Sequence, residues 1–216
     1  YRQFEYGSRR HIEFELIAEV GIRLGGVRAI DVEDVDSEEM TIGLRHRPEA
    51  NDDYGTPLKN GPDGERLINI SERLRDFIVD YVEHNRADVV DKFDRQPLLT
   101  TSGGRASTAT IRRDFYKMSR PCVYATNCPH DRDPTNCDAA KNEHAADCPS
   151  RFSTHPLRKW AIMTQLDSGV PKELLSDRVD VSVPVLDKHY DQRTEKQKSK
   201  RRRDELEKHL GEYSET

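Results

Sequence analysis

The sequence lacks any long run of apolar residues, and its start shows no signal-peptide pattern. These absences argue against a membrane-spanning helix and against secretion, and they predict a cytoplasmic protein without a membrane partner. Hydrophobic residues make up 34% of the 216 residues and charged residues 35%, which permits a folded core under a highly charged surface. The chain begins with Tyr1 rather than Met, which favours a fragment of a longer protein.

Lysine is also scarce. Only 11 of the 35 basic residues are Lys, Asp is more common than Glu, and the net charge is -5. This bias is typical of proteins from salt-loving organisms, but a genome rich in G and C produces it too, so both origins stay open. An acidic total argues against general nucleic-acid binding, although the local distribution of charge matters more than the sum.

Cysteine is confined to residues 119–152, where apolar residues nearly vanish. All the cysteines lie there with two histidines: Cys122, Cys128, Cys137, Cys148, His130 and His144. Such a segment cannot build its own core, so we predict a structural zinc held by four Cys, or by three Cys and a histidine such as His130. The spacing contains no CxxC pair, so a disordered loop with incidental thiols or a disulfide pair are alternatives.

The remaining pattern predicts an α+β fold that is mainly α-helical, with a small three-stranded antiparallel sheet and the Cys-rich insert. Apolar spacing and capping residues predict helices over residues 8–20, from Ser71, from about Ser107, from Ser153 or Thr154 to Gly169, and over 170–176. Strands are predicted over residues 38–46 and on both sides of a turn at 58–66, the second being 66–70. Asp88–Gln96 reads as a charged connector.

Residues 155–190 hold the strongest chemical signal. The helix that begins near Thr154 places His155 and Arg158 in its first turn, on nearly the same face. Free backbone N–H groups and the helix dipole favour an anion there, and a guanidinium holds two anionic oxygens as a fork. This pair therefore indicates a phosphate site, and Tyr190 could be a nucleophile that attacks the bound phosphate.

Three further features each allow a plain structural interpretation. Arg23 follows a glycine turn and either points inward or pairs with a carboxylate. Lys59 lies at the hairpin, where most lysines are only solvated. Tyr190 could be a packing residue at a helix end. The basic run Lys196–Arg203 is either a solvated face or a contact with a DNA backbone or a partner subunit.

Taken together, the order of these residues resembles the catalytic domain of the tyrosine recombinase (phage integrase) family. The matching segments are Gly21-Ile22-Arg23-Leu24-Gly25, Lys59, Thr154-His155-Pro156-Leu157-Arg158 and Leu186–Tyr190. The resemblance covers nearly the whole chain, and the acidic bias and Cys-rich insert look most like haloarchaeal members. It implies one catalytic domain over residues 1–216, with the insert at 119–152 and a basic helical tail at 191–216. The family's N-terminal core-binding domain would lie outside this chain.

The resemblance also implies an activity, in which a tetramer cuts and rejoins double-stranded DNA at specific attachment sites. Arg23 and Arg158 would neutralise the non-bridging phosphate oxygens, and Tyr190 would form a 3′-phosphotyrosyl link. Lys59 would protonate the leaving 5′-oxygen, and His155 would assist proton transfer or bind the phosphate. No cofactor is required for this catalysis.

Two departures from the family pattern favour a second hypothesis. The family usually has a second His or a Trp shortly after a Gly, and here Asp180 or Arg178 occupies that place. An ionised Asp180 cannot donate a hydrogen bond. The family's usual Glu after the first arginine motif is Gly26. The chain could thus be a catalytically impaired, integrase-like DNA-binding or regulatory protein. A type IB topoisomerase-like enzyme and a zinc-ribbon interaction module are further alternatives.

Overall fold

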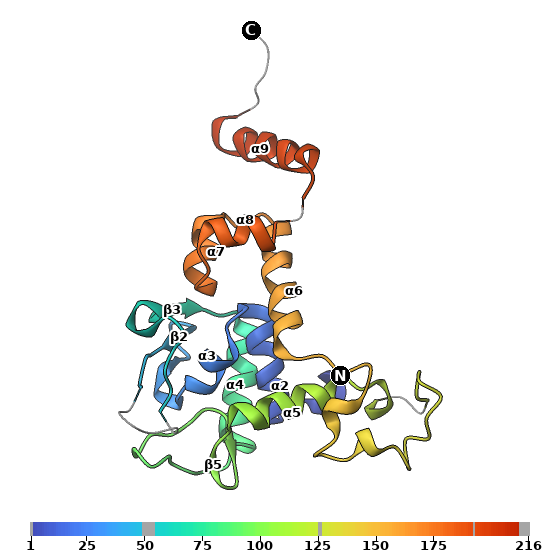
Figure 1. The fold of residues 1–216 in the computed structure, drawn as a ribbon. Coiled ribbons are helices and arrows are strands. Elements are labelled where there is room, and N and C mark those ends of the chain that lie inside the picture. The colour runs from blue at the N-terminus through green and yellow to red at the C-terminus, as the bar shows by residue number, and fades with distance from the viewer. Residues whose placement is uncertain (1, 49–54, 125–126, 192, 212–216) are drawn as a thin grey trace. The chain divides into compact units, whose positions relative to one another are not determined.

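The computed structural model describes residues 2–48, 55–124, 127–191 and 193–211. The chain divides into two compact units, Tyr1–Ala161 and Ile162–Thr216, and Figure 1 shows their elements in chain order. Each unit has a hydrophobic cluster of its own. Among the described residues, no helix combines the length and the apolar character needed to cross a membrane.

The first unit is organised around a helix that agrees with the prediction over residues 8–20. After the short α1 (Arg2–Glu5), α2 (Arg9–Glu15) begins at Ser8, whose hydroxyl accepts a hydrogen bond from the His11 amide at 3.2 Å. The helix continues as the π-helix η1 (Leu16–Val20), which the sequence did not predict, and ends at Gly21 with φ +74°. Only glycine adopts that left-handed conformation without steric cost.

Three more helices surround this one and bury their apolar faces. They are α3 (Leu24–Ala29), α4 (Glu72–His84) and α5 (Thr108–Met118). Figure 1 shows α2 beside α4 and α5, and α2 packs against both of them. Ser71 and Ser107 cap α4 and α5 through their hydroxyls, as their sequence positions predicted.

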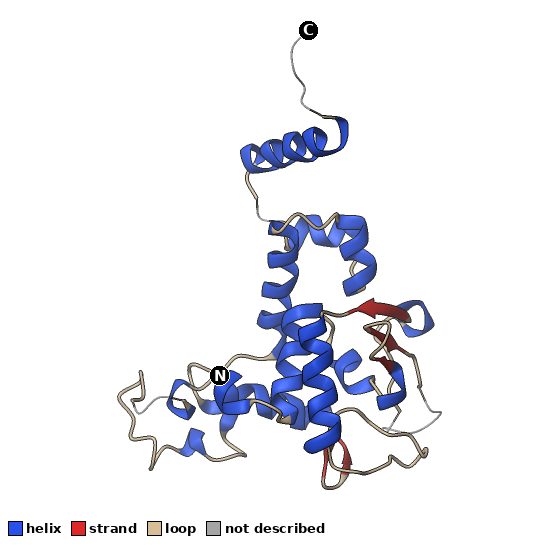
Figure 2. Cartoon of the chain, turned by 180° about the vertical axis from the view of Figure 1, so that it is seen from behind, coloured by secondary structure: helices blue, strands red, loops and turns tan. Residues whose placement is uncertain are grey.

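The predicted three-stranded antiparallel sheet is confirmed, with one strand placed differently. Its order is β1 (Val35–Asp36), β2 (Thr41–Leu44) and β3 (Arg66–Asn69). Figure 2 shows these strands in red beside the helices. The described residues just before the turn at 58–66 do not form the predicted strand. Among them, Thr56 makes an isolated bridge with Arg47, and β1 supplies the third strand of the sheet. A second hairpin joins β4 (Thr100–Thr101) to β5 (Gly104–Arg105).

Short 3-10 turns shape the segments between these elements. Two flank the sheet, η2 (Val32–Asp34) and η3 (Gly61–Gly64). Three more 3-10 turns lie within the described part of residues 119–152. They are η4 (Pro121–Val123), η5 (Asp138–Ala140) and η6 (Ala145–Asp147). The Phe152 amide donates to the Ser119 hydroxyl at 3.0 Å, so the two ends of this Cys-rich segment lie together.

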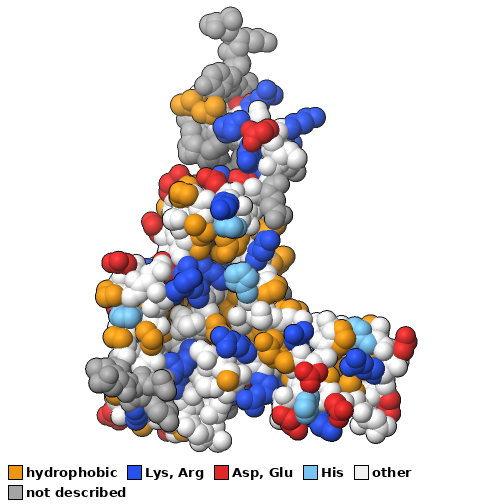
Figure 3. Space-filling model, in the orientation of Figure 1, with side chains coloured by type: hydrophobic (Ala, Val, Ile, Leu, Met, Phe, Trp, Pro, Cys, Tyr) orange, Lys and Arg blue, Asp and Glu red, His pale blue; other side chains and the backbone are white. Residues whose placement is uncertain are grey.

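The second unit is helical throughout its described residues. The helix α6 (Thr154–Asp167) begins in the first unit and ends in the second, and α7 (Lys172–Val179), α8 (Val183–His189) and α9 (Glu195–Leu210) follow. The helix predicted over residues 170–176 is thus confirmed with a shifted range. The helix expected in the basic tail at 191–216 is α9. Figure 3 shows basic side chains of α9 in blue, and Lys196, Lys200, Arg202 and Arg203 are exposed.

Candidate functional site

Arg158 and the turn that carries Arg23 meet in the first unit. Arg158 lies in the first two turns of α6, is only 5% exposed, and donates through its guanidinium to the Gly21 carbonyl, 137 residues away in the chain. Arg23 follows two residues later as the N-cap of α3, with extended backbone. The two arginines predicted to hold a phosphate therefore come from adjoining pieces of backbone.

The glycines after Arg23 allow close packing. A Cβ built on Gly26 would lie 3.5 Å from Leu44 Cδ1, so α3 rests directly on β2. A Cβ on Gly25 would lie 3.9 Å from the Pro57 carbonyl oxygen. The segment that leads to Lys59 thus contacts the same helix that Arg23 begins.

The backbone on both sides of Lys59 is fixed, whereas its side chain is exposed. Leu58 is buried, and its amide donates to His46 Nδ1 at 3.0 Å. The His46 amide in turn donates to Glu65 Oε1 at 2.7 Å, which ties the far side of the turn. His46 could not be picked out from the sequence, because a lone histidine at a strand end carries no periodic signal.

His155 is exposed in the first turn of α6, one turn before the buried Arg158. It completes the set of predicted residues in the first unit, with Arg23, Lys59 and Arg158. Of these four, Arg158 is bonded to the Gly21 carbonyl, two residues before Arg23. Residues of these types can bind an anion and move a proton: an arginine binds an anion, and a lysine or histidine can give or take a proton.

The two remaining predicted residues belong to the second unit. Tyr190 is the C-cap of α8: its amide donates to the Leu186 carbonyl at 3.0 Å, and its half-buried side chain packs against the second hydrophobic cluster. Asp180 is the C-cap of α7, with φ +54° and ψ 55°. Among non-glycine residues, Asp and Asn adopt this conformation most readily, so Asp180 has a helix-ending role that the sequence analysis did not consider.

The predicted zinc-binding group is not formed among the described residues. Among the described residues, no three or more His, Cys, Asp or Glu side chains form a group that could hold a metal ion. The cysteines are free thiols, so the alternative disulfide pair is not formed, and only Cys148 is buried. His130, the candidate histidine ligand, has its Nε2 atom 2.7 Å from the Ser150 hydroxyl.

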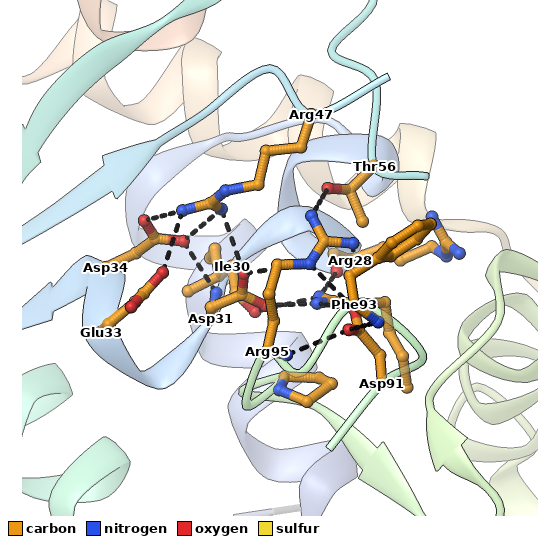
Figure 4. Close-up of polar contacts among 12 residues, drawn as sticks. Arg28, Ile30, Asp31, Glu33, Asp34, Arg47, Thr56, Asp91, Phe93 and Arg95 are labelled. Atoms are coloured by element: carbon orange, nitrogen blue, oxygen red, sulfur yellow. Dashed lines mark hydrogen bonds and ion pairs between the residues drawn. The ribbon is translucent and has the colours of Figure 1, made fainter. Parts of the chain in front are cut away.

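A buried network of charged residues is the main feature that the sequence analysis missed (Figure 4). Asp31 is fully buried and pairs with Arg105 and, at 3.2 Å, with Arg47. Arg47 also forms a two-bond fork with Asp34, at 2.8 Å for each bond. Arg105 continues to Asp91 at 2.8 Å. The network therefore joins the segment after α3 to the connector before β4.

This network holds the end of the helix that Arg23 begins. Arg105 donates to the Arg28 carbonyl at 2.9 Å and to the Ile30 carbonyl at 3.5 Å. Burial alone would raise the pKa of Asp91. The hydrogen bonds from the Arg105 and Arg95 side chains and from two backbone amides outweigh burial and lower that pKa to about 2. Asp91 is thus ionised at any physiological pH and anchors two guanidinium groups.

No protein-family model matches the chain, and no curated protein matches it. Solved structures do. The crystal structure of the XerA recombinase has a TM-score of 0.57 and 16% identity, with 95% of this chain and 57% of that chain covered. The Tn1549 transposon integrase in complex with transposon right end DNA has a TM-score of 0.64 and 15% identity, with 95% and 62% covered.

These neighbours are tyrosine recombinases and integrases at low sequence identity, and they show the fold. The chain spans 57% and 62% of the lengths of the XerA and Tn1549 chains. The predicted fold class, a mainly helical α+β domain with a small antiparallel sheet, matches the integrase catalytic fold and is confirmed at that level.

Proposed function

We propose that this chain is the catalytic part of a site-specific DNA recombinase that cuts and rejoins strands through a 3′-phosphotyrosyl intermediate on Tyr190. The observation that carries the proposal is the contact between Arg158 and the Gly21 carbonyl in a fold shared with recombinases. This contact joins Arg158 to the turn from which Arg23 follows two residues later, and both arginines match the sequence segments that resemble the family's phosphate-binding motifs.

In the proposed reaction, the Tyr190 oxygen attacks phosphorus, a new O–P bond forms, and the bond to the 5′-oxygen breaks. Lys59 gives a proton to the leaving 5′-oxygen, and His155 accepts the tyrosine proton. Arg23 and Arg158 neutralise the charge that grows on the non-bridging oxygens. Because the Gly21 carbonyl orients Arg158 before DNA binds, little reorganisation is needed in the transition state.

The partner in this proposal is double-stranded DNA that carries a recombination site. The Tn1549 integrase structures contain transposon right end DNA or circular intermediate DNA, which makes DNA the natural ligand to test here. Exposed cations on α9 would add contacts to phosphates, and such contacts weaken as salt rises. Assembly into a tetramer on DNA is part of the same proposal. The arginines and Lys59 supply the positive charge, so the proposed step needs no cofactor.

A second candidate is an integrase-like protein that binds DNA but cuts it poorly. Its support is the conformation of Asp180. Since Asp180 has the left-handed backbone that glycine favours, we infer that it replaces the family's turn glycine rather than the donor that follows it. The next residue, Val181, is apolar and 7% exposed, and it offers no side-chain donor. One phosphate contact would then be missing.

Covalent capture on DNA tests the two candidates. The protein is incubated with a pool of nicked suicide duplexes of random sequence, in low-salt and in high-salt buffer. Protein-linked DNA is isolated under denaturing conditions and sequenced, so the target site need not be known. Tyr190→Phe is the key variant, and Tyr6→Phe, which removes a hydroxyl from an exposed tyrosine, is its matched control.

The first candidate predicts an adduct that wild type and Tyr6→Phe form and Tyr190→Phe does not. DNA retention by all three proteins without any adduct would favour the second candidate. An adduct that persists in Tyr190→Phe would show that another residue is the nucleophile and would refute the assignment.

We also propose that zinc staples the Cys-rich segment, through thiols of Cys122, Cys128, Cys137 and Cys148. The ground for it is proximity, since the Cys128 and Cys148 thiols act electrostatically on Cys122. Burial raises the pKa of the Cys122 thiol, and bound zinc would have to offset that cost because it binds the thiolate. Zinc would have to draw these groups together, because they do not form a metal-holding group in the structure. Metal analysis of protein purified without chelator tests this proposal. A protein that is folded and metal-free would refute it.

A further inference from the structure

We propose that Asp191 is the positioning residue for Tyr190. With Lys172 and Arg193 it forms a set of ion pairs, here called the Asp191 clamp, that fixes the end of α8 to which Tyr190 belongs. The inference rests on the proposed function for its consequence in catalysis. The clamp itself lies wholly within the second unit.

The Asp191 carboxylate is buried, and both of its oxygens are paired. Its side chain is 1% exposed, although it stands next to a basic, exposed helix. Arg193 forms a fork with it, Nε to Oδ1 at 2.7 Å and NH2 to Oδ2 at 2.8 Å. The Lys172 ammonium reaches Oδ2 at 2.7 Å. The hydrogen bonds from Arg193 hold the pKa of Asp191 well below its usual range, so the clamp stays charged.

The clamp ties three helices to the residue beside Tyr190. Lys172 belongs to the first turn of α7, and Arg193 also donates to the Leu166 carbonyl in α6 at 3.3 Å. The amides of Tyr190 and Asp191 both donate to the Leu186 carbonyl of α8, at 3.0 and 2.9 Å. A movement of Asp191 would therefore disturb the Leu186 carbonyl, which also holds the Tyr190 amide.

The location makes this arrangement hard to explain as chance surface pairing. A carboxylate just after the C-terminus of α8 faces the negative end of the helix dipole, which is unfavourable. Burial adds a second cost unless the charge is paired and hydrogen-bonded. Two cations offset both costs. For a nucleophile that must approach phosphorus in line, a backbone held from α6, α7 and α8 leaves only the two side-chain torsions of Tyr190 to adjust.

The test uses Asp191→Asn, which keeps the shape and removes the charge. Asp187→Asn is the matched control, because Asp187 pairs with the same Lys172 but has a half-exposed side chain, and the Arg193 fork is formed with Asp191 instead. Three quantities are measured in each protein: amide hydrogen exchange at Tyr190 and Asp191, the rate of covalent adduct formation, and the affinity for DNA.

We expect Asp191→Asn to accelerate exchange at both amides and to slow adduct formation roughly 10- to 100-fold, as small misplacements of reacting groups do. DNA affinity should stay unchanged, because the clamp positions the nucleophile rather than the substrate. Asp187→Asn should resemble wild type in all three measurements. A cavity of about 330 Å³ is lined in part by Lys172, Asp191 and Arg193. Added formate should therefore restore much of the adduct rate of Asp191→Ala.

The outcomes separate the clamp from the proposed function. If wild type forms no adduct, the proposed function fails, and the exchange data still decide whether Asp191 holds the backbone of Tyr190. If wild type forms the adduct and Asp191→Asn matches it in exchange and rate, the clamp is refuted. Faster exchange with an unchanged adduct rate would also refute the proposal, because Asp191 would then stabilise the helix end without positioning Tyr190.

Discussion

Replacing Asp31 by Asn should destabilise the first unit more than the change of a single atom suggests. Asp31 is fully buried and pairs with Arg105 and Arg47, and the Arg105 side chain is only 5% exposed (Figure 4). Asn keeps the shape of the side chain but removes its charge. Two guanidinium groups then lose part of their compensation in a region that water reaches poorly.

The size of the effect follows from the partners that remain. Breaking a buried ion pair by removing one partner costs about 3–5 kcal/mol. Here Arg105 keeps Asp91 at 2.8 Å, and Arg47 keeps Asp34 at 2.8 Å. Burial also raises the pKa of Asp31, so its charge is itself costly in the folded state. We therefore expect a loss of about 2–3 kcal/mol, equivalent to a Tm decrease of roughly 4–12 °C.

Urea unfolding followed by far-UV circular dichroism measures this loss, with the m-value as a check that the transition is otherwise unchanged. Asp88→Asn is the matched control, because the Asp88 side chain is fully exposed and 3.9 Å from Arg86. Its effect should be below about 0.5 kcal/mol. A loss for Asp31→Asn no larger than that of the control would refute the reasoning and show that the network contributes little.

Three further variants probe the site and its support. Arg158→Lys keeps the charge but loses the fork and the anchor on the Gly21 carbonyl, so adduct formation should fall roughly 100-fold with folding intact. Asp180→Gly keeps the left-handed helix end, so the adduct rate should be unchanged, and a lost adduct would make Asp180 catalytic. The pKa of Asp91 is about 2, below an unfolded value of roughly 3.9. Its contribution, about 2 kcal/mol, is therefore complete above about pH 4 and lost as pH falls toward 2. An acid titration of stability should be flatter there in Asp91→Asn.

The helices were predictable because apolar residues repeat with the helical period and serines precede them. Leu74 and Ile78 on α4, and Ile111 and Phe115 on α5, are buried as their spacing predicted. The sheet was predictable as a unit but not in its outer strand. Two residues, Val35 and Asp36, are too few to produce an alternating pattern that a reader of the sequence could recognise.

The charged interior was not predictable from the same signals. The connector at residues 88–96 reads as solvated, yet the Asp91 and Arg95 side chains are only 8% and 11% exposed. Charged residues in a loop have no period. Arg105 pairs with Asp31, which follows the end of α3 and is 74 residues away in the chain. Their pairing depends on a tertiary fold that has already brought the two loops together.

The prediction of the candidate site had a different basis. The order of Arg23, Lys59, His155, Arg158 and Tyr190 resembles a family, and the structure confirms the fold of that family. The roles of these residues stay predictions. Local spacing indicates that a helix begins at Thr154. It does not predict the hydrogen bond from Arg158 to the Gly21 carbonyl, because that bond depends on the tertiary fold.

Arg120 offers a decisive test of the zinc proposal. It is 6% exposed and donates to the Ala139 carbonyl, and its Nε has no hydrogen-bond partner among the described residues. Zinc held by four thiolates carries two negative charges, which a buried guanidinium beside Cys122 would stabilise. Without zinc, the same guanidinium is a poorly compensated buried charge. Arg120→Met should therefore destabilise the zinc-loaded protein by about 1–3 kcal/mol, yet be neutral or stabilising after chelation. The measurement is thermal unfolding of both proteins with zinc and with chelator. An effect of equal sign and size in both conditions would mean that Arg120 faces no thiolate-bound metal, and the zinc proposal would lose its electrostatic basis.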